Sequence, residues 1–363
     1  MQLIWPIQFA EDDPEHLQGT LELPEPLPFQ SASLGSGFYR PGTLRLRGQC
    51  DLDLVLYHTE ATERFIYLHT GQADANLLQL AGLSPQEISG LGQVTLPGQL
   101  CMGSARSRLI GEAIAQIVGA PPLRETITPF RQQHLAVFPI AREGLKYQVA
   151  EAIYANYNYY CDEILLDAHH VFDQNVPVYN RKVEMTLFKD KDLDRLQREN
   201  IAVAFIADSI ASGLVMKEVI TRIKQRFDHI QRVEVISPLA TVRGLCRIAN
   251  AGLVNGVKLR VHVFETLLNA LPPDYYYSAH YAMPEFHIHP ELEEEYRAWW
   301  GEDVGGNFIA DTACAGYGWS EVFFSPRKQI EMINSQLQVR HGLSIADVLR
   351  RNLRGNSGAM AEC

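Results

Sequence analysis

The chain has 363 residues, of which 46% are hydrophobic and 21% are charged, a composition typical of a folded globular protein. Its net charge of −11 argues against a dedicated surface for nucleic acid or for an anionic membrane. The longest uninterrupted apolar run, residues 201–207, is far shorter than the roughly 20 residues of a membrane-spanning helix. The six cysteines form no C-x-x-C pair, so we expect no zinc site and reduced thiols in a cytoplasmic protein.

Residues 1–100 are expected to form a small β-rich N-terminal domain. They are rich in proline, and apolar and polar residues alternate at 43–47, 51–57 and 64–69. This alternation is typical of antiparallel strands that have one face in water. The segment carries no recognisable chemical motif.

From residue 101 onward the pattern changes to alternating strands and helices. Four apolar stretches predict buried strands, at 134–140, 201–206, 232–236 and 258–264. Four stretches with apolar residues on one face predict helices, at 104–118, 144–156, 213–227 and 241–253. A hairpin is expected from 163–172 and 176–188. We therefore expect an α/β fold, a parallel sheet flanked by helices, over 101–326, with an insertion at about 270–306 and C-terminal helices and a tail at 327–363.

A loop of small and polar residues follows the apolar stretch 201–207 and leads into a predicted helix. It consists of Asp208, Ser209, Ile210, Ala211, Ser212 and Gly213. Backbone N–H groups at a helix start favour a phosphate. The carboxylate beside them suits sugar hydroxyls or a magnesium ion. The alternative is an ordinary strand-to-helix turn capped by Ser209 or Ser212.

A second loop follows the apolar stretch 134–140 and contains Arg142, Glu143 and Gly144. Gly144 can adopt a positive φ and expose backbone donors, and Arg142 can bind a phosphate through two hydrogen bonds. The alternative is that Arg142 is a surface charge. Because the carboxyl ends of parallel strands meet at one edge of a sheet, both loops are expected at the same edge.

Taken together, the two loops resemble those of the type I phosphoribosyltransferases, and within them the uracil phosphoribosyltransferase-like group. In that family an Arg-x-Gly-Leu loop binds pyrophosphate, and an acidic residue with a Thr/Ser-Gly loop holds the ribose and 5-phosphate of phosphoribosyl pyrophosphate. The resemblance covers roughly residues 134–325. It implies a pyrophosphate site at Arg142, Glu143 and Gly144, a 5-phosphate site over residues 209–213, and a role for Asp208 at the ribose hydroxyls and at magnesium.

The same resemblance extends to two later features. Residues 308–318 are similar to the family's loop that contacts the base, which implies that Asp311 hydrogen-bonds a ring nitrogen of the acceptor and that Tyr317 stacks on it. The alternative is a glycine-rich turn before the C-terminal helices. Arg181 and Lys182 lie where these folds carry a hood, and there they would neutralise the departing pyrophosphate. The alternative is a solvated strand face.

The implied activity is transfer of a 5-phosphoribosyl group from phosphoribosyl pyrophosphate to a nitrogen of a base-like acceptor, with release of pyrophosphate and with Mg2+ as cofactor. The expected partners are these small molecules and further copies of the chain, with no nucleic acid and no membrane. The family usually has an acidic pair, or an acidic first residue, and later hydroxyls where this chain has Ala207, Leu214 and Val215. These departures motivate a second hypothesis, a non-catalytic nucleotide sensor or interaction module on the same fold.

Overall fold

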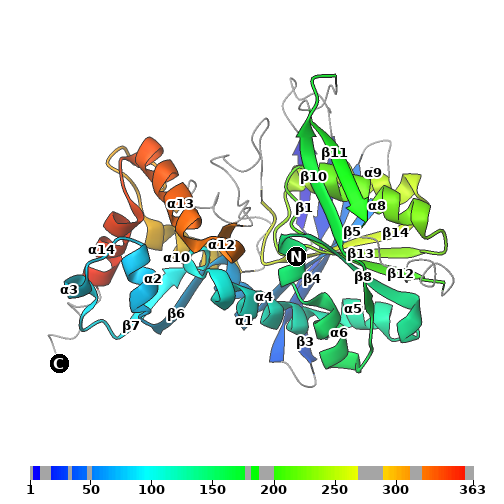
Figure 1. The fold of residues 1–363 in the computed structure, drawn as a ribbon, viewed down its shortest axis with the longest axis horizontal. Coiled ribbons are helices and arrows are strands. Elements are labelled where there is room, and N and C mark those ends of the chain that lie inside the picture. Colours follow the sequence, from blue (N-terminus) through cyan, green and yellow to red (C-terminus); the bar gives the residue numbers. More distant parts are fainter. Residues whose placement is uncertain are drawn as a thin grey trace.

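A computed structural model describes residues 3–8, 18–31, 35–46, 51–175, 181–187, 200–268, 289–310 and 321–355. The described strands form one mixed sheet of 12 strands and a separate sheet of two. In Figure 1 the large sheet and its helices form one lobe, and a smaller, mainly helical lobe lies beside it, with α4 (Gly103–Val118) running between them. The fold is therefore α/β.

The centre of the large sheet is parallel. In spatial order its strands are β5 (Asp51–Thr59), β14 (Lys258–Phe264), β13 (Arg232–Ile236), β12 (Val203–Ala207), β8 (Leu135–Ala141) and β10 (Leu166–Phe172). Side chains of β12 alternate between two cores, with Val203, Phe205 and Ala207 on one face and Ala204 and Ile206 on the other. Burial on both faces explains the continuous apolar sequence and confirms the predicted parallel sheet.

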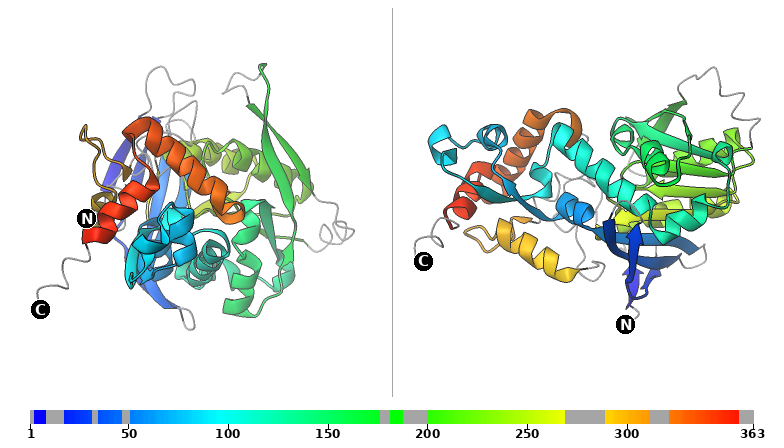
Figure 2. Two further views of the ribbon diagram at one scale, coloured as in Figure 1. Left: turned by 60° about the vertical axis from the view of Figure 1, so that its left-hand side comes forward. Right: turned by 90° about the horizontal axis from the view of Figure 1, so that it is seen from below.

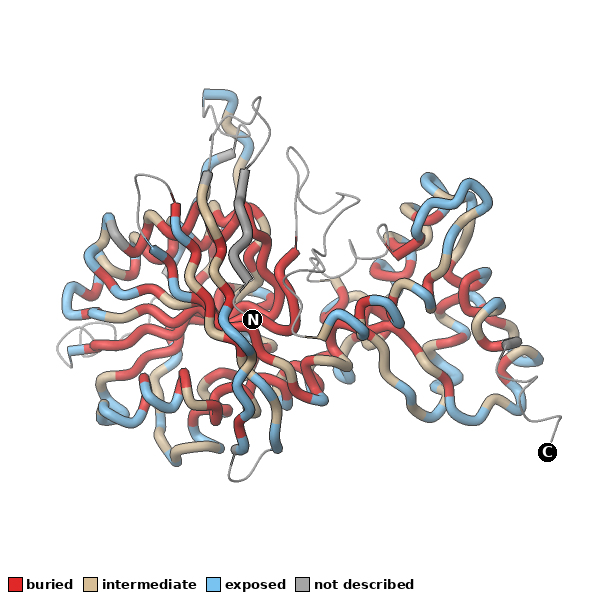
Figure 3. The backbone as a smooth tube through the Cα atoms, turned by 180° about the vertical axis from the view of Figure 1, so that it is seen from behind, coloured by how far each residue is buried: buried red, intermediate tan, exposed pale blue. Residues whose placement is uncertain are grey.

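Helices cover both faces of this parallel centre. On one face lie α4, α5 (Pro121–Ile127) and α6 (Val149–Tyr157), and on the other α8 (Leu214–Arg226) and α9 (Val242–Val254). Figure 3 shows the buried residues as bands along the strands and along the inner sides of these helices. Within the described ranges, no helix is both long enough and apolar enough to cross a membrane.

The N-terminal strands belong to the same sheet, which differs from the separate β-rich domain expected over residues 1–100. β5 pairs in parallel with β14, from Asp53 opposite Arg260 to Tyr57 opposite Phe264. Antiparallel neighbours then extend the edge, namely β4 (Gly35–Leu46), β3 (Leu27–Ser31), β2 (Gln18–Leu23) and β1 (Leu3–Gln8). The pairing of β5 with β14 joins residues far apart in the sequence, and no local pattern could reveal it.

The smaller lobe combines residues that follow β5 with the C-terminal helices (Figures 1 and 2). Its elements are β6 (Leu68–Gln72), β7 (Gln93–Pro97), α2 (Ala75–Leu80), α3 (Pro85–Ile88), α10 (Pro290–Trp300), α13 (Pro326–His341) and α14 (Ile345–Gly355). Trp299 Nε1 donates to the Thr95 carbonyl at 3.0 Å, and Arg350 Nε lies 2.7 Å from Glu87 Oε1. The division expected at residues 100 and 327 does not follow these lobes.

The single strand expected at 64–69 is wrong, because a helix occupies the first half of this segment and a strand begins only at its end. The helix α1 (Glu60–Ile66) is followed by β6, which begins at Leu68. Thr59 and Thr62 form a capping box, in which the Thr62 amide donates to Thr59 Oγ1 at 3.2 Å. Phe65 is 1% exposed on the inner side of this helix. The cap and the buried helical face outweigh the short alternation of apolar and polar residues.

A chain of buried hydrogen bonds crosses the neighbouring strands β5, β14 and β13. Tyr57 OH lies 2.8 Å from His262 Nδ1, and His262 Nε2 lies 2.6 Å from Glu234 Oε2. Arg232 Nε donates to Glu234 Oε1 at 2.5 Å. Burial lowers the pKa of His262. Burial opposes ionisation of Glu234, but the hydrogen bond from His262 and the nearby positive charges lower its pKa. The network therefore holds a neutral imidazole against a carboxylate.

Acidification is expected to weaken the fold through this network. Below about pH 6.5 the unfolded chain binds a proton at His262 that the folded chain does not, so the free energy of unfolding falls by up to ~1.4 kcal/mol per pH unit. Glu234 acts in the same direction at lower pH, because its stabilisation is lost as pH falls through its lowered pKa. We expect His262→Gln to reduce the loss of stability between about pH 7.5 and 5.5, measured by urea unfolding. The exposed His229→Gln is the control, and an unchanged slope in His262→Gln would contradict the assignment.

Candidate functional site

The two loops predicted to bind phosphates meet at the carboxyl edge of the sheet, where β8 and β12 are parallel neighbours. After β8 the chain passes through a cis peptide bond between Ala141 and Arg142 and enters a short 3₁₀ helix, η3 (Glu143–Lys146). A Cβ atom on Gly144 would lie 2.0 Å from the carbonyl oxygen of Ala207. Only glycine permits this approach, so the contact between the two loops is built into the backbone.

Three polar side chains join the two loops above this contact. Tyr147 OH donates to Glu143 Oε1 at 2.5 Å, and Ser209 Oγ donates to the same oxygen at 2.8 Å. The hydroxyls of Tyr147 and Ser209 are 2.8 Å apart. Glu143 is 8% exposed. Ser209 and Glu143, each predicted to bind substrate, therefore bind each other in this structure and hold the loops together.

Asp208 and Glu143 form an electrostatically coupled pair of carboxyl groups. Burial and the charge of Glu143 raise the pKa of Asp208 well above its ordinary value. Burial also raises the pKa of Glu143, although the hydrogen bonds from Tyr147 and Ser209 and the charge of Arg106 oppose this shift. Repulsion between two such carboxylates is relieved when they share a proton or bind a cation. The pair can therefore release its shared proton and bind a metal ion instead, or accept a hydrogen bond from a sugar hydroxyl.

Arg142 is the exposed part of the first loop, with 59% of its side chain accessible. Its Nη2 atom lies 3.7 Å from Glu321 Oε1, and its guanidinium carbon lies 5.3 Å from the ring centre of Phe324. Both partners belong to α12 (Glu321–Phe324). Lys328 Nζ lies 2.9 Å from the same Glu321 oxygen. Because this guanidinium is exposed and carries five N–H donors, it can bind an anion at the carboxyl edge.

The second loop packs tightly on the start of α9. The Ile210 amide donates to the carbonyl of Leu239 at 2.8 Å. Gly213 has φ of 75°, and a Cβ atom there would lie 2.6 Å from the carbonyl oxygen of Gly244. The Ser209–Gly213 stretch is expected from the sequence to bind a phosphate, whereas the side of Gly213 on which a side chain would lie faces α9. Its lack of a side chain serves the packing of the loop.

The carbonyl groups of this loop are held by two side chains at α9. Thr241 Oγ1 donates to the Ala211 carbonyl at 2.5 Å, and Arg247 donates to the Ser212 carbonyl. In a trans peptide the C=O group and the following N–H group point in opposite directions. The amides of Ser212 and Gly213 therefore point away from α9. This orientation turns backbone donors outward, as a phosphate site requires.

The start of α8 lies directly after this loop. The N-cap of this helix is Gly213, so neither Ser209 nor Ser212 occupies the capping position that the alternative interpretation of the turn expected. Ser212 lies just before it, and its Oγ atom accepts a hydrogen bond from the Leu214 amide at 3.3 Å. The first amides of a helix have no acceptor within the helix. The positive end of the α8 dipole adds to the outward amides of the loop and favours an anion beside Gly213.

The hairpin predicted to form a hood extends beyond the carboxyl edge (Figure 1). Only Leu166 and Asp167 of β10 pair with β8, and the rest of β10 runs past the end of that strand together with β11 (Arg181–Leu187). Lys182 Nζ lies 3.2 Å from Glu184 Oε1 and is not joined to either loop. The side chain of Arg181 lies outside the described part of the structure.

The predicted acceptor residues Asp311 and Tyr317 also lie outside the described residues. Glu321 is the first described residue after them, and it lies beside Arg142. The C-terminal flank of the predicted acceptor segment is thus next to the first loop. The prediction that Asp311 and Tyr317 face the Asp208 site stays a prediction.

A further polar cluster lies at the same edge of the sheet, two strands away from Asp208. Glu265 is fully buried with φ of 57°, accepts a hydrogen bond from Thr62 Oγ1 at 2.5 Å, and lies 3.0 Å from His58 Nδ1. Burial acts to lower the pKa of His58, but the hydrogen bond and charge of Glu265 raise it overall. The ring of His289 lies 4.2 Å from that of His58. This cluster joins β5 and β14 to the start of α10.

Sequence reasoning missed the side chains that support the two loops. Tyr147 follows Glu143 by one helical turn, a spacing that could have revealed their contact. Arg243 and Arg247 are one turn apart in a mainly apolar helix and are 1% and 4% exposed. A buried arginine on an apolar face indicates that the guanidinium binds another buried polar or charged group. Arg247 does so by donating a hydrogen bond to the Ser212 carbonyl.

The donor set at the two loops suits a magnesium ion that is bound together with substrate. Within the described ranges, no group of three or more His, Cys, Asp or Glu side chains could hold a metal ion by itself. Mg2+ in phosphate-binding sites usually takes one or two carboxylates and completes its shell with water and substrate oxygens. Asp208 and Glu143 fit this requirement, and a bound cation would relieve their mutual repulsion.

Comparison with known proteins gives no independent guide to the function. No model of a known protein family matches the chain, and no curated protein matches it.

Proposed function

We propose that the protein transfers a 5-phosphoribosyl group from phosphoribosyl pyrophosphate to a nitrogen of a base-like acceptor, on a phosphoribosyltransferase-like fold. The observation that carries the proposal is the direct contact of the two loops through Gly144 and Ala207. One loop offers outward amides at a helix start, and the other offers an exposed guanidinium. Two adjoining anion sites suit a ribose that carries a phosphate at one end and a pyrophosphate at the other.

Each part of the site has a role in this reaction. The amides of Ser212 and Gly213, with the α8 dipole, hold the 5-phosphate. Asp208 orients the ribose hydroxyls, and Arg142 and the backbone of Gly144 hold the pyrophosphate. Mg2+ bound with the substrate would neutralise pyrophosphate charge and stabilise the leaving group. The C–O bond to pyrophosphate breaks through an oxocarbenium-like state, and its electron pair leaves on the pyrophosphate oxygen. The acceptor nitrogen forms the new C–N bond with its lone pair and releases its proton to the departing pyrophosphate or to water. Positioning and charge stabilisation supply the rate enhancement.

A nucleotide sensor is the second candidate function, and one observation favours it. The hydroxyl of Ser209 is engaged by Glu143 and Tyr147, so it is not free to bind the phosphate in this arrangement. Leu214 and Val215 supply no hydroxyl in its place. A site with fewer phosphate donors and no need for a leaving group would suffice for a nucleoside monophosphate.

Calorimetric titrations separate the two functions. One arm uses phosphoribosyl pyrophosphate with MgCl2, and the other uses a nucleoside monophosphate. If the protein is the enzyme, we expect Arg142→Ala to weaken the binding of phosphoribosyl pyrophosphate about tenfold or more, because a charge-assisted contact is worth about 1.5–3 kcal/mol. The affinity for the nucleoside monophosphate should stay nearly unchanged. Arg131→Ala, at the other end of β8, is the control. Equal losses for both ligands, or binding of the monophosphate alone, would contradict the enzyme and favour the sensor.

The pH dependence of substrate binding tests the carboxyl pair. Because burial and Glu143 raise the pKa of Asp208, the affinity for magnesium phosphoribosyl pyrophosphate should increase with pH as the pair loses its proton. Glu143→Gln removes the neighbouring charge while keeping an oxygen that accepts from Tyr147 and Ser209. This increase should then occur at lower pH. Dissociation constants measured between about pH 5.5 and 8.5 provide the test, and coincident profiles for the two proteins would contradict the coupling.

A further inference from the structure

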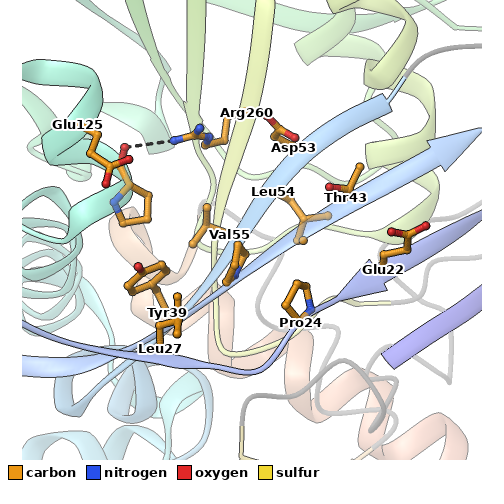
Figure 4. Close-up of a pocket in the computed structure, with 13 residues that line it drawn as sticks. Glu22, Pro24, Leu27, Tyr39, Thr43, Asp53, Leu54, Val55, Glu125 and Arg260 are labelled. Carbon is orange, nitrogen blue, oxygen red and sulfur yellow. Dashed lines mark hydrogen bonds between the residues drawn. The ribbon is translucent and has the colours of Figure 1, made fainter. Parts of the chain in front are cut away.

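A second concave site lies on one face of the large sheet, toward the amino ends of the parallel strands. It is a pocket of about 350 Å³, which is within the size range of small-ligand sites. Its walls come from β2, β3, β4, β5, β14 and the first turns of α5 (Figure 4). Asp53 and Arg260 are each the third residue of a strand whose carboxyl end lies at the loop edge. The pocket is therefore separate from the proposed transferase site.

Opposite charges lie next to one another along one side of the pocket. Figure 4 shows Arg260 between Asp53 and Glu125. Arg260 Nη1 donates to the carbonyl of Pro122 at 3.1 Å, which fixes the guanidinium between the sheet and α5. Asp53 is the cross-strand neighbour of Arg260, yet in the described structure neither the Asp53 nor the Glu125 carboxylate has a hydrogen-bond or ion-pair partner. Arg260 keeps further N–H donors for a ligand, since a guanidinium has five.

The other side of the pocket is apolar. Tyr39, Leu27 and Val55 contribute to it, together with the rings of Pro24 and Pro41. Leu27 is 44% exposed, and the Tyr39 hydroxyl has no hydrogen-bond partner in the described structure. An exposed leucine and a half-buried tyrosine offer a surface on which an apolar group would lose contact with water.

We propose that this pocket binds a small zwitterion of the amino-acid class with an apolar side chain. Its carboxylate pairs with Arg260, its ammonium pairs with Asp53 or Glu125, and its side chain packs on Tyr39 and Leu27. A simple anion would meet Arg260 but also two carboxylates, and a simple cation would meet the carboxylates but also Arg260. Only a ligand that carries both charges satisfies both kinds of group. This proposal is independent of the transferase activity.

Ligand chemistry tests the two charged contacts without altering Arg260, whose substitution would disturb α5. L-phenylalanine, its amide and its N-acetyl derivative are titrated in saturation-transfer-difference NMR. A ligand of this size in an open pocket is expected to bind with Kd of about 0.1–1 mM. The amide lacks the carboxylate and the N-acetyl derivative lacks the ammonium, and each should bind at least tenfold more weakly. Glycine, which lacks the apolar side chain, should also bind at least tenfold more weakly.

Variants of the chain complete the test. The double variant Asp53→Asn and Glu125→Gln should bind L-phenylalanine at least tenfold more weakly. Both side chains are exposed and have no partner in the described structure, so the fold should be retained. Asp228→Asn, at an exposed site beyond α8, is the matched control and should bind as the parent does. The proposal is overturned if L-phenylalanine shows no saturable binding up to about 10 mM. It is equally overturned if the amide or the N-acetyl derivative binds as well as the parent amino acid, or if the double variant is unchanged.

Discussion

Gly144→Ala is expected to separate the two loops and to abolish high-affinity binding of phosphoribosyl pyrophosphate. The added carbon would lie 2.0 Å from the carbonyl oxygen and 3.0 Å from the carbonyl carbon of Ala207. Because both atoms belong to the backbone at the end of a central strand, neither can move aside without disturbing the sheet. Overpacking of this kind costs about 1–3 kcal/mol of stability.

Urea unfolding and calorimetric titration measure the two effects of Gly144→Ala. Gly71→Ala is the matched control, because a Cβ atom on Gly71 meets nothing within 4 Å. Gly71 lies in β6 of the smaller lobe, so its substitution should change neither stability nor ligand affinity by more than a small amount. A Gly144→Ala protein with parental stability and parental affinity would show that the loops need no contact.

Arg247→Ala is expected to weaken the binding of ribose 5-phosphate by about ten- to a hundredfold. The guanidinium holds the Ser212 carbonyl from the side of α9, and its loss releases the peptide that turns the Gly213 amide outward. Hydrogen bonds made by charged groups contribute about 1.5–3 kcal/mol, which corresponds to this range. Thr241→Val should act in the same direction at the Ala211 carbonyl, with a smaller effect because the lost donor is neutral.

Chemical rescue distinguishes positioning of the loop from a general loss of structure. Guanidinium ions added at low concentration should restore part of the affinity of Arg247→Ala and should leave the parent unchanged. Arg222→Ala removes an exposed arginine from α8 that pairs with Glu218, and it serves as the control. If Arg247→Ala binds ribose 5-phosphate as tightly as the parent, the side chain does not position the phosphate loop.

The parallel centre of the fold could be predicted from the sequence because it is buried on both faces. Residues 258–264 and 232–236 were expected to be strands, and they are β14 and β13. Continuous apolar stretches of this length, in alternation with amphipathic helices, have few other folded solutions. The arrangement of the N-terminal strands could not be predicted, because the pairing of β5 with β14 depends on residues that are distant in the chain.

The candidate site could be predicted as a pair of loops but not as a set of contacts. Residue types at Arg142 and Asp208 and their positions after buried strands were enough to place both loops at one edge. The bond from Ser209 to Glu143 and the clamp from Arg247 depend on distances between elements, which a sequence pattern does not contain. Gly213 was expected to allow a phosphate to approach the backbone, whereas in the structure its lack of a side chain allows close packing against Gly244.

A crystal structure with ribose 5-phosphate and magnesium pyrophosphate bound is the most direct test of the proposed transferase site. The account predicts phosphate oxygens within about 2.7–3.2 Å of the amide nitrogens of Ser212 and Gly213. It also predicts ribose hydroxyls at Asp208 and pyrophosphate between Arg142 and the backbone of Gly144. Density for the sugar phosphate away from the carboxyl edge of β12, or a ribose that does not contact Asp208, would contradict it.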